Sequence, residues 1–218
     1  MMDILFKAAL AMDISLNEKE LVLFETYYKE LLIWNKKINL VAVKSELDIP
    51  IKHFIDSLTV LPHINNKTAK ILDIGSGAGF PGIPLKIAMN SLKVFLLDSS
   101  RKKTSFLKHI IRSLSITDTT VIHNRAENLM EDETYGGFFE VVISRATLKL
   151  PQLLQIGAFF LSQSGTLISM KGKKSDTELA EAADISHNLG LHYIASHDIT
   201  LPITGDFRRI IIYKKAFK

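Results

Sequence analysis

The sequence predicts an α/β protein: a doubly wound, mostly parallel sheet of Rossmann-like type, with a terminal antiparallel strand and an N-terminal helical cap. From residue 67 onward, short apolar runs alternate with segments of helical period, as expected for a parallel sheet covered by helices on both faces. The last two apolar runs, 193–202 and 208–215, are separated by a turn without a helix. We therefore expect these two strands to pair antiparallel at one edge of the sheet.

The elements of the expected core follow one another without a linker or an internal repeat. The expected strands are 70–75, 93–98, 119–124, 138–146 and 165–172. The expected helices between them are 82–89, 102–114 and 152–161.

The first part of the chain is expected to be helical. Ser15 and Glu18 have the spacing of a capping box and predict the start of a helix. Apolar residues then recur at helical intervals, namely Leu21, Phe24, Tyr28 and Leu31, toward Trp34. Pro50 predicts the start of a second helix, which presents Ile51, Phe54, Ile55 and Leu58 on one side. Residues 1–66 thus form the cap and 67–218 the core of one domain.

Composition excludes some classes of protein and leaves others open. The 218 residues include no cysteine, which excludes disulfides, thiolate metal sites and cysteine nucleophiles. No unbroken apolar stretch reaches the ~18 residues of a membrane helix, and the N-terminus lacks the pattern of a secretory signal. We expect a soluble cytoplasmic protein. The net charge of +4 is compatible with a polyanionic partner, and equally with a basic enzyme that acts on a small molecule.

A glycine-rich loop follows the first expected strand, in the segment ILDIGSGAGFPG at 71–82. Glycines in such numbers let a backbone turn sharply or approach a ligand closely. The loop has no Gly-Lys-Ser/Thr ending, which excludes a P-loop, and Phe80 stands where a dinucleotide fingerprint needs its third glycine. The bulky Phe80 and Pro81 leave little room for a pyrophosphate, so the spacing favours a ligand without one.

Acidic residues at the ends of the next strands fit a nucleoside. Asp98 ends the second strand, where a carboxylate can accept hydrogen bonds from both hydroxyls of a ribose; it can also simply cap the next helix. Ala126 and Glu127 follow the third strand and either flank an adenine or lie in an ordinary surface loop. A ribose-binding acid beside a loop without room for pyrophosphate favours S-adenosyl-L-methionine over NAD.

Eight segments in this order resemble the glucose-inhibited division protein B family, bacterial methyltransferases of small-subunit ribosomal RNA. The segments are WNKKINL (34–40), KHFIDSL (52–58), ILDIGSGAGFPGIPLKI (71–87), LLDSSRKKTSFL (96–107), NRAENL (124–129), VISRA (142–146), MKGKK (170–174) and RRIIIYKK (208–215). The resemblance spans nearly the whole chain. It implies a class I S-adenosylmethionine-dependent methyltransferase that modifies N7 of a guanine in 16S ribosomal RNA.

The same resemblance implies roles for individual residues. The cofactor-binding set that we expect is Asp73, Gly75, Gly77, Phe80, Asp98, Ala126, Glu127 and Arg145. Arg145 resembles the polar residue that borders both cofactor and target base, and we treat it as the catalytic candidate. The chain departs from the family pattern at Ser76 (usually Thr), at Lys52 (commonly Arg) and in the polar segment that follows Arg145.

The chemistry of the candidate residues agrees with guanine N7 as the target. Methylation at C5 of cytosine needs a cysteine nucleophile, which the chain lacks. The fourth strand ends without the Asn/Asp-Pro-Pro motif common in amino-group methyltransferases. Guanine N7 carries an in-plane lone pair and needs no deprotonation, so positioning alone can suffice. Arg145 then contacts guanine O6, a phosphate or the cofactor carboxylate, or it forms a structural ion pair.

Basic residues gather in segments that the fold brings toward the carboxyl ends of the strands, where they either grip RNA phosphates or form a solvated face. These residues are Lys36, Lys37, Lys44, Lys52, Arg101, Lys102, Lys103, Lys171, Lys173, Lys174, Arg208 and Arg209. We expect His53 and Asp56 to join the cap to the core and Trp34 to anchor the cap. No metal site is expected, because the histidines lack ligand spacing.

The expected partner is 16S ribosomal RNA or the small ribosomal subunit during assembly, with no membrane, and we expect a monomer. One alternative is an S-adenosylmethionine methyltransferase that acts on another RNA or on a small molecule. The other alternative is an RNA-binding module that senses the cofactor without activity.

Overall fold

A seven-stranded sheet organises the fold in the computed structural model, which describes residues 1–173 and 175–216. Within these residues the strand order is β3-β2-β1-β4-β5-β7-β6. The strands are β1 (Lys70–Ile74), β2 (Lys93–Asp98), β3 (Thr119–His123), β4 (Phe139–Arg145), β5 (Leu161–Lys171), β6 (Leu191–Thr200) and β7 (Phe207–Lys215). Strands β1 to β5 pair in parallel, and β7 lies antiparallel between β5 and β6. The predicted antiparallel pair at the sheet edge is confirmed.

The order of the strands reverses between β1 and β4, which are neighbours although two strands separate them in sequence. Asp73 of β1 pairs in register with Leu96 on one side and with Ile143 on the other. In open α/β sheets, ligands bind outside the carboxyl ends of the strands at such a reversal. We therefore expect a ligand to bind at the loops that follow β1, β2, β3 and β4.

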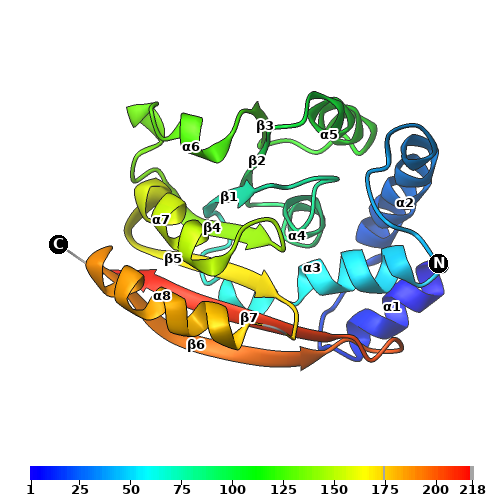
Figure 1. Cartoon of the computed structure of the whole chain (residues 1–218). Coiled ribbons are helices and arrows are strands. Elements are labelled where there is room, and N and C mark those ends of the chain that lie inside the picture. Colours follow the sequence, from blue (N-terminus) through cyan, green and yellow to red (C-terminus); the bar gives the residue numbers. More distant parts are fainter. Residues whose placement is uncertain (174, 217–218) are drawn as a thin grey trace.

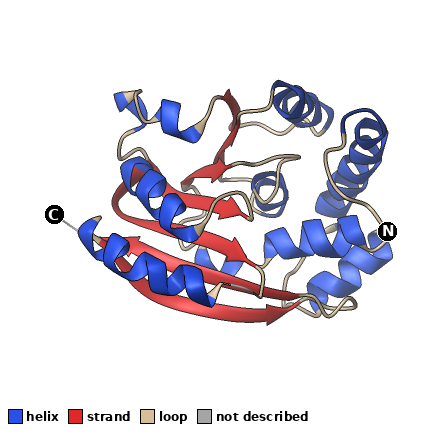
Figure 2. Ribbon diagram, viewed as in Figure 1, coloured by secondary structure: helices blue, strands red, loops and turns tan. Residues whose placement is uncertain are grey.

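Helices cover both faces of the sheet (Figures 1 and 2). One face carries α4 (Gly82–Ala88) and α5 (Arg101–Ser113), with α2 (Glu18–Ile38) packed outside them. The other face carries α7 (Leu150–Phe160) and α8 (Asp176–Asn188), and the short α6 (Ala126–Leu129) follows β3. Each helix layer packs on the sheet through its own buried apolar cluster, so both faces of the central strands are shielded from water.

The cap consists of α1 (Met2–Leu10), α2, a π-helix η1 (Asp48–Ile55), its continuation α3 (Asp56–Leu58) and the 3₁₀ turn η2 (Leu61–His63). A second 3₁₀ turn, η3 (Glu133–Tyr135), precedes β4. The apolar residues of the cap and those of one sheet face belong to a single buried cluster. The cap is thus packed onto the core by the same hydrophobic contacts that hold the core together.

The capping box of α2 lies two residues later than predicted. Asn17, and not Ser15, caps the helix: its Oδ1 accepts from Glu20 N at 3.0 Å, and Glu20 Oε2 accepts from Asn17 N at 2.8 Å. Both pairs have the same spacing in sequence. The later start leaves Leu16 outside the helix, where it is buried in the core.

Tyr27 ties the cap to the glycine loop. Its ring is fully buried, 5.1 Å from the ring of Phe54 and 5.5 Å from that of Phe80, and its hydroxyl donates to the Ala78 carbonyl. The predicted Tyr28 is only half-buried. Trp34 packs 5.6 Å from Phe106, which confirms it as an anchor of the cap on α5.

Candidate functional site

The glycine loop between β1 and α4 is fixed to the end of β2. The backbone N–H groups of Gly75 and Ser76 both donate to the Leu97 carbonyl, at 2.8 and 3.0 Å. Gly75 has a φ of +73°, and a Cβ there would lie 2.4 Å from Cγ2 of Thr147. Only glycine combines this backbone conformation with so close an approach of a neighbouring side chain.

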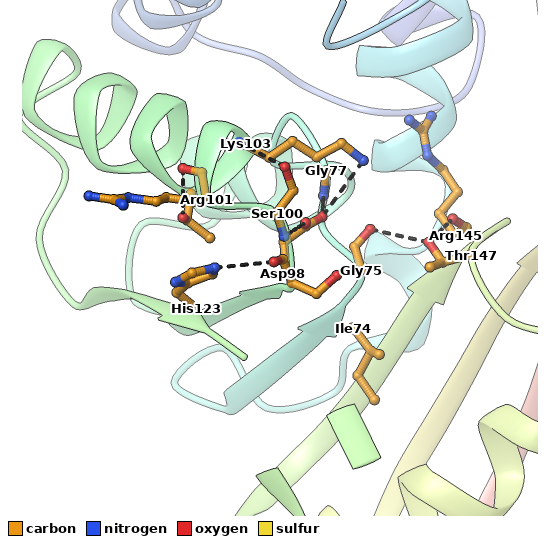
Figure 3. Close-up of polar contacts among 12 residues, drawn as sticks. Ile74, Gly75, Gly77, Asp98, Ser100, Arg101, Lys103, His123, Arg145 and Thr147 are labelled. Atoms are coloured by element: carbon orange, nitrogen blue, oxygen red, sulfur yellow. Dashed lines mark hydrogen bonds and ion pairs between the residues drawn. The ribbon is translucent and has the colours of Figure 1, made fainter. Parts of the chain in front are cut away.

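Asp98 holds the same loop through its side chain (Figure 3). Oδ2 accepts from Gly77 N at 2.9 Å, and Oδ1 accepts from Ser100 N at 2.8 Å. The nearest cation is Lys103, with Nζ 4.0 Å from Oδ2. An ionised carboxylate has about four lone-pair directions, so two backbone bonds leave Asp98 able to accept further hydrogen bonds. It is Ser100 whose side chain caps α5, by accepting from Lys103 N.

A cavity of about 320 Å³, called here the nucleoside cavity, opens at the ends of β1 to β4. Four residues of the predicted cofactor set line it: Gly75, Asp98, Ala126 and Glu127. The lining also includes residues that sequence reasoning did not single out for the cofactor, such as Ser99, Lys103, Asn124, Arg125, Thr147 and Leu148. All of these follow β2, β3 or β4, so their position at the strand ends was the available signal.

Three other residues of the predicted set do not line this cavity and instead hold the glycine loop in position. Gly77 donates to Asp98 as described, and Phe80 is buried with its ring stacked 5.0 Å from that of His53. Asp73 is fully buried, and its Oδ2 accepts from Gly82 N at 2.9 Å at the start of α4.

The second oxygen of Asp73 has no hydrogen-bond partner in the described part of the chain. Burial raises the pKa of the Asp73 carboxyl to about 7, although the Gly82 hydrogen bond and the charge of Arg145 both lower it.

Arg145, at the end of β4, turns away from Asp98 and toward the cap (Figure 3). Nη1 donates to the Lys52 carbonyl and to Asp56 Oδ2, both at 3.1 Å, and Nη2 lies 3.1 Å from His53 Nδ1. The guanidinium also lies over the ring of Phe80, 5.0 Å from its centre. His53 and Asp56 therefore join the cap to the core as predicted, with Arg145 as their partner.

His53 serves this network as a neutral acceptor. Burial, and then the neighbouring charge of Arg145, lower the pKa of His53 to about 3, although Asp48 and a backbone hydrogen bond with Ala42 act in the opposite direction. The imidazole is therefore uncharged at neutral pH, and its Nδ1 accepts the bond from Arg145. It has no proton to exchange at that nitrogen.

Arg145 does not line the nucleoside cavity; it lines a second cavity, of about 520 Å³, between η1, the ends of β4 and β5 and the start of β7. We call it the cationic cavity, because its lining includes the side chains of Lys44, Lys52, Arg145, Lys171 and Arg208. The carboxylates in the lining are Asp48 and Asp56.

The segment that follows Arg145 separates the two cavities. Ala146 lines the cationic cavity, whereas Thr147 and Leu148 line the nucleoside cavity. Ala146 has a φ of +55°, and Thr147 Oγ1 lies 3.2 Å from the Gly75 carbonyl oxygen and 3.1 Å from that of Arg145. The polar segment in which the chain departs from the family pattern thus lies at the junction of the two cavities.

The remaining basic residues of the predicted set are dispersed. Arg209 binds the carboxylates of Asp198 and Asp176 and does not line the cationic cavity. Lys103 lines the nucleoside cavity. Lys174 lies outside the described residues. Among the residues that are described, no group of three or more histidines and carboxylates could hold a metal ion, and no helix is long and apolar enough to span a membrane.

Solved structures share the fold of this protein. TYW2 of M. jannaschii in complex with AdoMet aligns with a TM-score of 0.58 and 14% identity, covering 73% of this chain and 74% of that one. A precorrin-6y C5,15-methyltransferase from Geobacter metallireducens aligns with a TM-score of 0.54 and 14% identity, over 73% and 86% of the two chains. The seven-stranded sheet with its single reversed strand is the fold of the class I S-adenosylmethionine-dependent methyltransferases.

Within this class, sequence similarity is specific. Residues 20–196 match the GidB family model, described as rRNA small subunit methyltransferase G. A ribosomal RNA small subunit methyltransferase G from Syntrophus aciditrophicus is 46% identical over 211 residues, covering 96% of this chain and 88% of the relative. The protein of the same name from Carboxydothermus hydrogenoformans is 40% identical over 202 residues, covering 93% and 86%. The chain belongs to the GidB family.

Proposed function

We propose that this protein transfers a methyl group from S-adenosyl-L-methionine to N7 of a guanine in 16S ribosomal RNA. The strongest support is membership of the GidB family over nearly the whole chain, together with the nucleoside cavity at the strand ends. The substrate is 16S ribosomal RNA or an assembling small subunit, and the enzyme then acts in the cytoplasm, as a monomer.

The residues of the nucleoside cavity fit this cofactor. Asp98 keeps acceptor directions beyond the bonds to Gly77 and Ser100, as a ribose with two hydroxyls requires. Gly75 and Thr147 both line the cavity at the end of β1, and the absence of a Cβ at Gly75 lets the Thr147 side chain pack against its backbone there. Ala126 and Glu127 line the same cavity and are the proposed adenosine contacts.

The other residues of the cofactor set act through the loop. Gly77 donates to Asp98, Asp73 fixes the start of α4 through Gly82, and Phe80 packs between His53 and Tyr27. These contacts hold the loop in place before the cofactor binds. We assign them to the site as supports.

When bound, S-adenosylmethionine supplies an electrophilic methyl group on a sulfonium. The protein's own part is to position the guanine so that the N7 lone pair points at that carbon, because N7 needs no general base. The neutral His53 and the ion-paired Arg145 agree with such a site, since neither is set up to take a proton at neutral pH. Methylation leaves a positive charge on the guanine.

We propose that Arg145 is the catalytic residue and that it acts by orienting a ligand. Three of its N–H donors are engaged by Lys52, Asp56 and His53, which fixes the guanidinium at the wall of the cationic cavity. Its remaining N–H groups are proposed to orient the target base or the cofactor carboxylate at the junction of the cavities.

The proposal is tested by nucleoside mass spectrometry of small-subunit RNA from cells that lack this protein. The expected result is loss of one 7-methylguanosine, which returns when the purified protein and S-adenosylmethionine are added to the RNA or subunit. Restoration of a different methylated nucleoside, or methylation of transfer RNA only, identifies another methyltransferase. Cofactor binding without any methylated product identifies a sensing module.

A further inference from the structure

The cationic cavity contains more positive charge than its own carboxylates neutralise. Five cationic side chains and two carboxylates line it. Asp48 is already bonded on both oxygens: Oδ2 accepts from the backbone N–H groups of Lys44 and Ser45, and Oδ1 lies 3.2 Å from Lys52 Nζ. Glu178 and Asp206 pair with Lys171 and Lys52 from outside the lining, so one positive charge remains in excess, and this excess favours an anionic ligand.

Asp56 binds both arginines that line the cavity, one with each of its carboxylate oxygens. Its side chain is 3% exposed, with Oδ2 3.1 Å from Arg145 Nη1 and Oδ1 3.1 Å from Arg208 Nε. Arg145 is further bound by Lys52 and His53, so three of its N–H groups are already engaged by the protein. Arg208 donates through Nη1 only to its own neighbour, the Phe207 carbonyl. Within the described chain, Nη2 of Arg208 has no partner.

Lys44 is the second cation available to a ligand. It is exposed, it lines the cavity, and its Nζ has no carboxylate within ion-pair distance in the described residues. Lys171, by contrast, is bound by Glu178 at 2.8 Å, and Lys52 lies between Asp48 and Asp206. Arg208 from β7 and Lys44 from the cap therefore line the cavity with N–H donors that no group in the described chain uses.

The position of the cavity suggests which anion it binds. It adjoins the nucleoside cavity through the segment after Arg145, in which Ala146 lines one cavity and Thr147 the other. A polynucleotide whose base reaches the cofactor has a phosphodiester on either side of that base. Arginine and lysine are the side chains that proteins use to bind such phosphates.

We propose that the cationic cavity is a phosphate subsite for the RNA, in which Arg208 and Lys44 bind a backbone phosphate next to the target nucleotide. Asp56 is the positioning residue that holds Arg208 by its Nε and leaves its Nη2 for the ligand. This inference rests on the proposed function, because it takes RNA as the substrate.

The test measures the affinity of a small-subunit RNA transcript for wild type, Arg208→Ala and Lys44→Ala over a range of KCl concentrations. Loss of a charge-assisted hydrogen bond predicts that Arg208→Ala raises the Kd for RNA about 10- to 100-fold. For each variant, the slope of log affinity against log salt falls by about 0.7 to 0.9. Kd for S-adenosylmethionine stays at the wild-type value.

Controls separate this result from misfolding. Arg112→Ala removes an arginine from an exposed position near the end of α5, so RNA affinity and salt slope should not change. Lys44→Ala breaks no ion pair in the described chain, so it tests the subsite even if Arg208→Ala weakens the fold.

Wild-type RNA affinity and salt slope in both variants would overturn the subsite, as would a rise in Kd for S-adenosylmethionine, which would assign the cavity to the cofactor. Failure of the proposed function is a separate result: the wild-type enzyme would then form no 7-methylguanosine.

Discussion

Asp98→Asn tests the nucleoside cavity more sharply than any larger change, because it keeps the shape of the side chain. Each oxygen of Asp98 accepts a different backbone N–H group, Gly77 N on Oδ2 and Ser100 N on Oδ1. An asparagine has only one oxygen, so its NH₂ group must face one of these two N–H groups. The variant both disturbs the loop and loses acceptors for the ribose.

The magnitude follows from these bonds. An unsatisfied buried N–H costs about 1–3 kcal/mol, and a hydrogen bond to a charged group contributes about 1.5–3 kcal/mol. The variant has the unsatisfied N–H of the loop with or without ligand, so only part of that cost weakens binding. We therefore expect cofactor binding to lose about 2–4 kcal/mol, which raises the Kd roughly 30- to 1,000-fold.

Isothermal titration with S-adenosylmethionine measures this directly, and thermal unfolding reports the disturbance of the loop. Asp184→Asn is the matched control, because it removes the same charge from an exposed position on α8. If Asp98→Asn binds the cofactor as tightly as Asp184→Asn does, then Asp98 does not contact the ribose and the reasoning is refuted.

Three further predictions concern the supports of the site. Gly75→Ala should lower the free energy of unfolding by at least about 1–2 kcal/mol, because φ is +73° and a Cβ would lie 2.4 Å from Thr147 Cγ2; unchanged denaturant unfolding would contradict this. Burial raises the pKa of Asp73 from its usual 3.8 to about 7, so wild-type stability should fall as pH rises through that window, whereas an equal fall in Asp73→Asn would exclude Asp73 as its source. Arg145→Ala leaves Asp56 with Arg208 alone and should cost about 1–3 kcal/mol of stability and slow single-turnover methylation; a wild-type rate and cofactor affinity would remove Arg145 from the site.

Much of the fold is predictable from sequence because its strands are buried on both faces. Largely apolar runs such as 93–98 and 139–145 are typical of strands in a parallel sheet that helices cover on both faces. The helix α8 was not predicted, since its only buried residues are the small Ala182 and Ser186 and it shows weak apolar periodicity. The start of α2 was misplaced because Ser15 and Asn17 offer the same local pattern, and tertiary packing decides between them.

The candidate site was predictable to the extent that it depends on strand ends. Gly75, Asp98, Ala126 and Glu127 come from three strands and line one cavity, since the parallel sheet brings these ends to one edge. Sequence could not show that Arg145 faces the cap, because that orientation depends on partners 89 and 92 residues away. It also could not separate Arg208 from Arg209, which alternate across β7 and meet different carboxylates.

We propose that S-adenosylmethionine lies between the glycine loop and Asp98, near Arg145, which the cap holds in place. A crystal structure with S-adenosylhomocysteine bound tests it most directly. We expect the ribose hydroxyls on Asp98, the adenine beside Ala126 and Glu127, and the amino acid portion over Gly75. Ligand density in the cationic cavity, or a ribose away from Asp98, would contradict it.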